Sequence, residues 1–399
     1  MKLIVRMGLS FVVLSFYLSC SRLPAQELKT DQRQAEIAHK VVTISAKVMP
    51  GEVVVISGGI QKLPLMEALA IEAAKAGARV APLFVTTDNI QRSSIADVSE
   101  EYLGQPAPMM EWLKNIDVWI STADTEDSKA VLEGIPENKL AKASRSADAF
   151  RAALNHSKLR GVSIGVPNRK DAEYAQVDWA VYQQMQWDAI NADYKQIADK
   201  GNQLAKLLEN AKSVRITSPS GTDLTVALGN RKAFVNAGIL GEQPRDTDAF
   251  MSRLTSLPGG DVIVAPIENS ANGKVVALKD NCRPYEYLTG ATYVFKDGKM
   301  VSFNAKGNPE CFEQDYSAYG GDKDRVASLQ IGLNLALKVM EDGSDYRPGD
   351  AAGMVFIGMG INQLLGGNNK TEFGWVIPVV KASVEIDGKT VVKDGQLVL

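Results

Sequence analysis

The chain has 399 residues, of which 45% are hydrophobic and 23% charged, and its formal net charge is -3. This composition is typical of a globular protein with room for two domains, and the small charge gives no reason to expect a nucleic-acid partner. Only two histidines are present, so few imidazoles are available for a zinc or cobalt centre. We expect His39 to face solvent from a polar helix and His156 to cap the end of another helix.

The N-terminal end predicts export. Lys2 and Arg6 precede the apolar run Met7–Leu18, which is too short to span a bilayer but has the length of a signal-peptide core. Cys20 follows this run and resembles the lipidated cysteine of a bacterial lipoprotein. Cleavage after Ala25 is the alternative. Both alternatives place the mature protein in the bacterial cell envelope, either in the periplasm or anchored to the outer membrane, with membrane contact only through a lipid.

The next part of the chain alternates between strands and helices. The apolar run Glu52–Ser57 is typical of a buried parallel strand, and the helix and strand that follow it complete a β-α-β unit. Gly58 and Gly59 lack the spacing of a dinucleotide-binding loop and predict a tight turn instead. Strands are expected at 52–57, 78–86, 118–121 and 159–166, and helices at 26–47, 64–76, 106–115, 152–156 and, as one long linking region, 180–210.

After residue 210 the pattern changes to short strands and tight turns. Strands are expected at 214–217, 223–226, 262–265, 274–278 and 354–359, hairpins at 293–303 and 378–399, and a helix at 327–340. The Asp-Gly pairs that begin at Asp297, Asp387 and Asp394 predict the hairpin turns. We therefore predict a signal peptide (1–26), an α/β N-terminal domain with an open parallel sheet (27–210), and an α+β, hairpin-rich C-terminal domain (211–399).

One stretch of the C-terminal half combines turn signals with a single carboxylate. Pro258, Gly259 and Gly260 form a turn, a short apolar strand follows, and Glu268 comes directly after it, before a second apolar strand. A carboxylate held between two strands suits a metal ligand or a general base. A solvated hairpin acid is the alternative interpretation from the pattern alone.

The sequence L-P-G-G-D-V-I-V-A-P-I-E-N-S-A-N-G, which contains Glu268, resembles the signature of the thermophilic metallo-aminopeptidases, the aminopeptidase T group. The segment Gly221–Leu224 also resembles a motif of this family. The resemblance implies that Glu268 is a ligand of a divalent cation, zinc or cobalt, that relatives are peptidases, and that they form homodimers.

The other ligand positions of the family carry different side chains here. Ser328 stands where the resemblance implies a glutamate, Phe356 where it implies a histidine, and Phe373 and Trp375 where it implies a His-x-Asp pair. We therefore expect a lost metal site, with the three rings near Glu268 and with the pKa of this carboxyl raised by burial without a cation.

Three functions follow as hypotheses, and the sequence leaves open whether the protein is an enzyme. The first is an exported metallo-aminopeptidase. The second is a non-catalytic protein of the cell envelope that binds a peptide or another small molecule in the remaining cleft. The third, an enzyme with metal-free chemistry, ranks last because no Ser-His-Asp or Cys-His set is visible. For the second hypothesis, polar contacts to the ligand could come from Asn269, Asn272, Asn368, Asn369 and Lys370.

Cys282 and Cys311 flank a predicted pair of strands. In an oxidising compartment they could form a disulfide. Two buried free thiols are the alternative, and the sequence alone does not decide between them.

Overall fold

The protein is described by a computed structural model that covers residues 32–105, 108–136, 138–143, 150, 153–154, 157–240, 250–283, 286–339 and 348–399. The predicted signal segment with Cys20, and also His156, lie outside these residues. Within the described part of the chain, no helix combines the length and the apolarity needed to cross a membrane.

A parallel sheet, sheet A, forms the first layer, with strand order β2-β1-β4-β5-β9 and with β3 also paired to β1. Its strands are β1 (Val53–Gly59), β2 (Arg79–Val80), β3 (Phe84–Thr86), β4 (Val118–Thr122), β5 (Arg160–Ile164) and β9 (Leu254–Leu257). β1 carries the apolar run expected of a strand with both faces covered, and most of its residues are buried.

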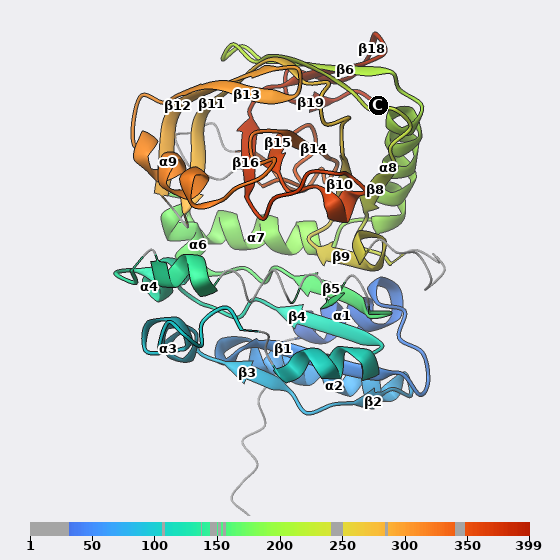
Figure 1. Cartoon of the computed structure of the whole chain (residues 1–399). Coiled ribbons are helices and arrows are strands. Elements are labelled where there is room, and N and C mark those ends of the chain that lie inside the picture. The colour runs from blue at the N-terminus through green and yellow to red at the C-terminus, as the bar shows by residue number, and fades with distance from the viewer. Residues whose placement is uncertain are drawn as a thin grey trace, which may run out of the picture.

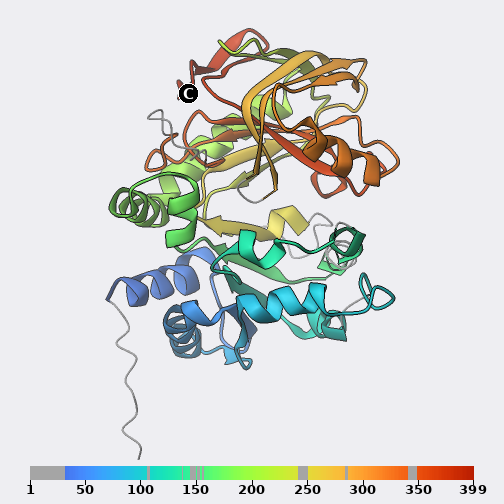
Figure 2. The ribbon, with the colours of Figure 1, turned by 90° about the vertical axis from the view of Figure 1, so that its left-hand side faces the viewer.

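Most of the helices cover this sheet or connect it to the rest of the molecule, whereas the last two, α8 and α9, pack on two antiparallel sheets (Figure 1). The helices are α1 (Gln32–Lys40), α2 (Leu63–Lys75), α3 (Asp88–Ala96), α4 (Ser128–Leu132), α6 (Arg169–Tyr174), α7 (Trp179–Ile190), α8 (Tyr194–Glu209) and α9 (Pro309–Ala318). A π-helical turn follows α1 at Val41–Ser45, and 3₁₀ turns lie at Ile60–Lys62, Pro108–Asn115, Phe250–Arg253 and Gln363–Leu365. Figure 1 shows α6 and α7 between two bodies, one built on sheet A and the other on two antiparallel sheets, and the view at right angles keeps this division (Figure 2).

The second body contains sheets B and C. Sheet C has the order β16-β15-β14-β10-β8, with strands β8 (Ala233–Asn236), β10 (Asp261–Val264), β14 (Val326–Gly332), β15 (Val355–Gly360) and β16 (Gly374–Val379). Sheet B arches over it (Figure 1) in the order β13-β12-β11-β7-β6-β17-β18-β19. Its strands are β6 (Ser213–Thr217), β7 (Asp223–Ala227), β11 (Asn272–Arg283), β12 (Glu286–Lys296), β13 (Lys299–Asn304), β17 (Ser383–Ile386), β18 (Lys389–Lys393) and β19 (Gln396–Leu397). The predicted fold class, a parallel α/β part followed by a hairpin-rich α+β part, is confirmed.

The predicted Pro-Gly-Gly turn carries the chain from sheet A to sheet C, since β9 ends at Leu257 and β10 begins at Asp261. A Cβ atom on Gly259 would lie 2.6 Å from the backbone nitrogen of Gly238, and one on Gly260, whose φ is +138°, would lie 2.7 Å from Cβ of Asn334. Because side chains would collide at both positions, glycine is required for this close crossing.

Several expected elements differ in the structure. The described part of the helix expected at 106–115 is a 3₁₀ helix, and the strand expected at 78–86 is two strands, β2 and β3. The helix predicted at 327–340 is wrong: its first half is strand β14, where Leu329 and Ile331 are buried and alternate with half-buried Ser328 and Gln330. This two-residue period, which fits a strand, outweighs the helix-forming residues nearby. The single long helix predicted at 180–210 is two helices, because Asp193 begins α8 by accepting a hydrogen bond from the backbone N–H of Gln196.

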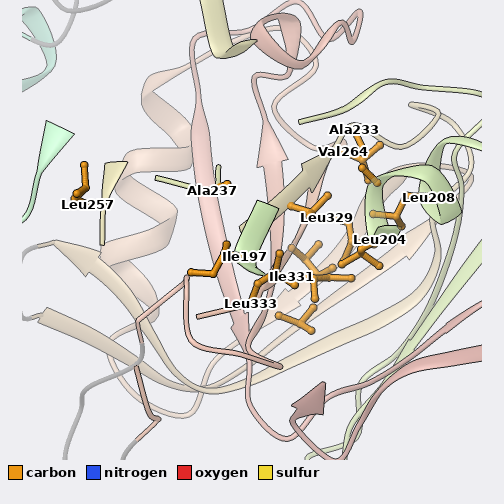
Figure 3. Packing of buried hydrophobic residues seen from close by; sticks show 14 of the residues in the cluster. Ile197, Leu204, Leu208, Ala233, Ala237, Leu257, Val264, Leu329, Ile331 and Leu333 are labelled. Atoms are coloured by element: carbon orange, nitrogen blue, oxygen red, sulfur yellow. The ribbon is translucent and has the colours of Figure 1, made fainter. Parts of the chain in front are cut away.

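Two elements cross the expected boundary near residue 210. Strand β9 comes after this boundary and joins sheet A, whereas α8 comes before it and packs on sheet C. Figure 3 shows Ile197, Leu204 and Leu208 of α8 among buried side chains of the antiparallel strands. One continuous hydrophobic cluster therefore links the two bodies.

Candidate functional site

Glu268 lies just beyond the end of β10, and its side chain is 18% exposed. Nη2 of Arg231 donates to both carboxylate oxygens, at 2.9 Å to Oε1 and 2.8 Å to Oε2. Oε1 also accepts from the backbone N–H of Asn368 at 2.7 Å and from Nδ2 of Asn362 at 3.4 Å. A guanidinium, a backbone amide and a side-chain amide therefore satisfy this carboxylate.

The electrostatics of Glu268 differ from the expectation. Burial alone would raise the pKa of its carboxyl. Backbone hydrogen bonds, including the one from Asn368, and the positive charge of Arg231 act in the opposite direction and hold the pKa below its usual value. The predicted rise of this pKa is wrong, because the backbone hydrogen bonds and the charge of Arg231 together outweigh the effect of burial.

Glu268 lines a shallow hollow of about 360 Å³. The other lining residues are all polar and come from the C-terminal half: Asn269, Asp322, Arg325, Asn368 and Asn369. Nε of Arg325 donates to Asp322 at 3.1 Å, and Nη1 donates to the backbone oxygen of Glu268 at 3.2 Å. The hollow therefore belongs to the second body alone and is not a cavity between the two bodies. Three of the asparagines predicted to contact a ligand, Asn269, Asn368 and Asn369, do line it.

The structure separates the four other predicted site residues into two pairs. Ser328 on β14 and Phe356 on β15 point to one face of sheet C, because Ser328 is paired with Gly358 and Phe356 with Gln330. Trp375 is paired with Met359 and points to the opposite, buried face. Phe373 is fully buried next to it, with the two rings stacked at a centroid distance of 6.4 Å.

Phe373 and Trp375 belong to an aromatic cluster between sheets B and C. The ring of Phe312 on α9 lies 4.9 Å from that of Trp375, and Nε1 of Trp375 donates to Oδ2 of the buried Asp280 at 3.0 Å. The hydroxyl of Tyr293 donates to the same oxygen at 2.7 Å. Both rings therefore belong to this cluster and do not line the hollow at Glu268; a former ligand role for them stays a prediction.

The donor set around Glu268 does not fit zinc or cobalt. Within the described part of the chain, the only His, Cys, Asp and Glu side chains that converge in a group of three are Cys282, Glu286 and Cys311. In this group the two sulfurs are joined in a disulfide, with 5.9 Å between the Cα atoms, and a disulfide offers no thiolate ligand. This bond fastens α9 to β11 and corresponds to the first of the two alternatives for the cysteines.

Sequence reasoning missed Arg231 and a pair of buried carboxyls. Asp261 accepts from Nδ2 of Asn236 at 2.8 Å and is hydrogen-bonded to Asp350. Burial and the negative charge of Asp261 raise the pKa of Asp350 well above its usual value, so Asp350 carries the shared proton. The Asp in P-G-G-D was visible in the sequence, but no local signal pointed to its partner.

Two of the cavities apart from Glu268 lie next to each other. The larger, of about 700 Å³, is lined by residues 129–143 on one side and by α9 with the disulfide on the other. A second cavity, of about 470 Å³, includes Lys370 and shares Ala141, Ala318 and Tyr319 with the first. The two form a continuous groove between the bodies, which is where ligand sites are common.

Comparison with known proteins identifies relatives. A model of the thermophilic metalloprotease family (M29) matches residues 30–317. Aminopeptidase PepS of Streptococcus thermophilus is 26% identical over 295 residues, which are 67% of this chain and 69% of that protein. The 2,5-dihydroxypyridine 5,6-dioxygenase of Pseudomonas putida is 26% identical over 203 residues, which are 48% of this chain and 56% of the dioxygenase.

Two solved structures share the fold. Wild-type AmpT from Thermus thermophilus has a TM-score of 0.70 at 16% identity, over 92% of this chain and 99% of AmpT. The 2,5-dihydroxypyridine dioxygenase from Pseudomonas putida KT2440 has a TM-score of 0.60 at 15% identity, over 92% and 96% of the respective chains. Because proteins named for two different reactions have this fold, the reaction of the present chain has to be argued from its site residues.

Proposed function

Because this chain belongs to the thermophilic metalloprotease family M29, we propose that it is an exported family member whose metal site is lost and whose peptidase activity is weak or absent. The observation that carries the proposal is the ion pair of Glu268 with Arg231. The charge of this carboxylate is already balanced by a guanidinium that donates to both oxygens, so a divalent cation would have to displace Arg231.

The other charged groups of the hollow support the same proposal. Asp322 accepts from Nε of Arg325 and, at 2.9 Å, from the backbone N–H of Lys370. The one histidine within the described residues, His39, is 66% exposed and pairs with Glu72 on the first body. A zinc or cobalt site needs about four ligands, and the groups around Glu268 are mainly hydrogen-bond donors. The resident metal of the family has no matching ligand set here.

Metal analysis and an activity assay test this proposal together. We expect the purified mature protein to contain far less than one zinc or cobalt per chain and to release little product from aminoacyl test substrates, even after cobalt is added. Glu268→Ala should lower the melting temperature but leave any residual peptidase activity nearly unchanged. Stoichiometric metal, with peptidase activity that a chelator abolishes, would instead establish an active metallo-aminopeptidase.

Export is the second part of the proposal. It is supported by Lys2 and Arg6, by the apolar run Met7–Leu18, and by Cys20, the predicted site of lipid attachment. In the native cell we expect the mature chain to begin at Cys20 and to carry lipid. An intact mass that corresponds to a start at Gln26 would show ordinary signal-peptide cleavage instead of lipid attachment. A mature chain that still begins at Met1 would contradict export.

Binding without catalysis is the alternative function, and the groove between the bodies favours it. The larger cavity has the volume of a small-molecule site and combines an apolar wall, with Leu132 and Ile135, with polar groups from α9. A thermal-shift screen of short peptides tests this function, with Ala318→Trp as a variant that fills the groove. We expect a bound peptide to raise the melting temperature of the wild type but not of this variant. Separately, we expect light scattering to give the mass of a homodimer.

A further inference from the structure

Arg231 is aimed at Glu268 by a tight turn after β7. The turn closes with a hydrogen bond from the backbone N–H of Arg231 to the oxygen of Leu228 at 3.1 Å. Gly229 and Asn230, with φ of +57° and +61°, both have left-handed backbone conformations, which glycine and asparagine adopt most readily. The sequence therefore commits this turn to a conformation that presents one long basic side chain to one carboxylate.

The ion pair joins three segments that are far apart in the sequence. Arg231 lies 37 residues before Glu268, and its Nη1 also donates to the backbone oxygen of Gly366. The backbone N–H of Asn368, 100 residues after Glu268, donates to the same carboxylate. Arg231 and Glu268 are 15% and 18% exposed, so their interaction is only partly screened by water. The pair thus fastens the loop 362–368 to the ends of β7 and β10.

We propose that the guanidinium of Arg231 is a built-in cation that occupies the place of a divalent metal at Glu268 and holds the loop 362–368 against the sheets. The proposal deepens the function proposed above, and it rests on that function only where it treats Glu268 as a former metal-binding group. A fixed guanidinium satisfies the carboxylate wherever the carboxyl is ionised, because arginine does not lose its proton. It also repels any second cation that approaches the same oxygens.

A matched pair of substitutions tests the structural part. Arg231→Met keeps an unbranched side chain of similar volume, although a shorter one, and removes the charge and the hydrogen-bond donors. Arg215→Met is the control, because Arg215 also binds a carboxylate, that of Asp223, through two hydrogen bonds of 2.9 and 3.0 Å, but both partners are about half exposed. Breaking a partly buried pair leaves an uncompensated charge, whereas breaking an exposed one does not.

Arg231→Met should lower the melting temperature by about 3 to 6 °C, and Arg215→Met should leave it nearly unchanged. Thermolysin, which cuts next to leucine, should cleave near Leu364 and Leu365 at least tenfold faster in Arg231→Met than in the wild type, with the sites read by mass spectrometry. The double variant R231M/E268M should melt higher than R231M, since it removes the unpaired carboxylate. Equal melting temperatures and cleavage rates for the two single variants would overturn the proposal.

Cobalt tests the metal-exclusion part. Millimolar cobalt(II) should raise the melting temperature of Arg231→Met by about 2 °C, but should have no such effect on the wild type or on R231M/E268Q. If Arg231→Met responds no more than the wild type, the guanidinium does not exclude the metal. This failure is distinct from failure of the proposed function, which would appear as resident metal and chelator-sensitive peptidase activity in the wild type.

Discussion

The two faces of sheet C carry different kinds of side chain. One face packs on sheet B, and it is apolar and aromatic, with Leu329, Ile357 and Trp375 buried. The other face, called the polar face below, carries Asp261, Ser328, Gln330 and Phe356. At the first face, the indole N–H of Trp375 is satisfied by Asp280 of sheet B, which also accepts from Tyr293. The second face places carboxyls and amides side by side.

The difference teaches that register, more than residue type, decides what belongs to a site on a sheet. Ser328, Phe356, Phe373 and Trp375 were expected to surround one vanished cation, yet the structure places two on the polar face and two in the aromatic cluster. A one-residue shift of an alignment moves a side chain through the sheet. For Ser328 and Phe356 a former ligand role stays a prediction. On the strand that carries Trp375, the residues that share the face of Ser328 and Phe356 are Gly374, Val376 and Pro378.

Trp375→Asp should cause the largest loss of stability, because it changes the buried aromatic face of sheet C. It would remove a buried indole and place a second carboxylate beside the buried Asp280. We expect a loss of more than about 4 kcal/mol in the free energy of unfolding, measured by urea denaturation. Trp375→Phe is the control: it keeps a ring but loses the indole donor, and it should cost about 1 to 2 kcal/mol. A stable Trp375→Asp variant that binds metal would return Trp375 to the predicted site.

Much of the fold was predictable because its signals are local. The three Asp-Gly turns have the positive φ values that such turns require at both residues, as at Asp297 and Gly298. The apolar run of β1 also marked its own position. By contrast, β14 combines alternation with residues that also suit a helix, and its strand partners decide the outcome.

The candidate site was less predictable because its contacts are distant in the sequence. Glu268 could be singled out by its motif, but its partners lie 37 residues before it and 94 and 100 residues after it. No periodicity encodes such pairing. The Asp261–Asp350 pair is hidden in the same way, since Asp350 lies in a loop that only the fold brings to β10.

Asp261→Ala should have the second largest effect, because it opens the polar face where that face is most buried. Asp261 is 6% exposed and accepts hydrogen bonds from Asn236 and Asp350. Its loss would remove the acceptor that Asp350 uses and would also break the hydrogen bonds with Asn236 and Gln330, at a cost of about 3 kcal/mol in the free energy of unfolding. Asp261→Asn, which keeps an oxygen acceptor, should cost less. If Asp261→Ala and the wild type have the same midpoint urea concentration, water can reach the polar face and replace the lost hydrogen bonds.

The pH dependence of stability should distinguish the polar face from the hollow at Glu268. The pKa of Asp350 is raised in the folded protein by burial first and by the charge of Asp261 second. The free energy of unfolding should therefore decrease as the pH rises above about 4, the unfolded value, towards this raised pKa, by at most about 1.4 kcal/mol per pH unit. Asp350→Asn has no proton to lose and should not show this decrease.

Asp322 is the control for this titration. Its pKa is lowered, first by the hydrogen bond from the backbone N–H of Lys370, so its contribution to stability is present at neutral pH and is lost as the pH falls. Asp322→Asn should therefore differ from the wild type mainly above pH 4 and should keep the decrease that Asp350 causes. A wild-type stability that rises steadily from pH 4 to pH 7 would contradict the assignment of the shared proton.

Phe356→His should have the smallest effect, although it restores the residue type that the family resemblance implies. Phe356 is half-buried on the polar face beside Gln330, so an imidazole can reach polar partners there and should cost only about 1 kcal/mol in the free energy of unfolding. It should not create a metal site. Phe356 is in register with Gln330 and Ile263, whereas Glu268 lies beyond the end of β10 and is held by Arg231. Cobalt absorption spectra and urea denaturation of Phe356→His check both statements, with Phe356→Leu as the apolar control. Visible cobalt bands in Phe356→His alone would show that the polar face, and not the hollow at Glu268, retains the capacity to bind a metal.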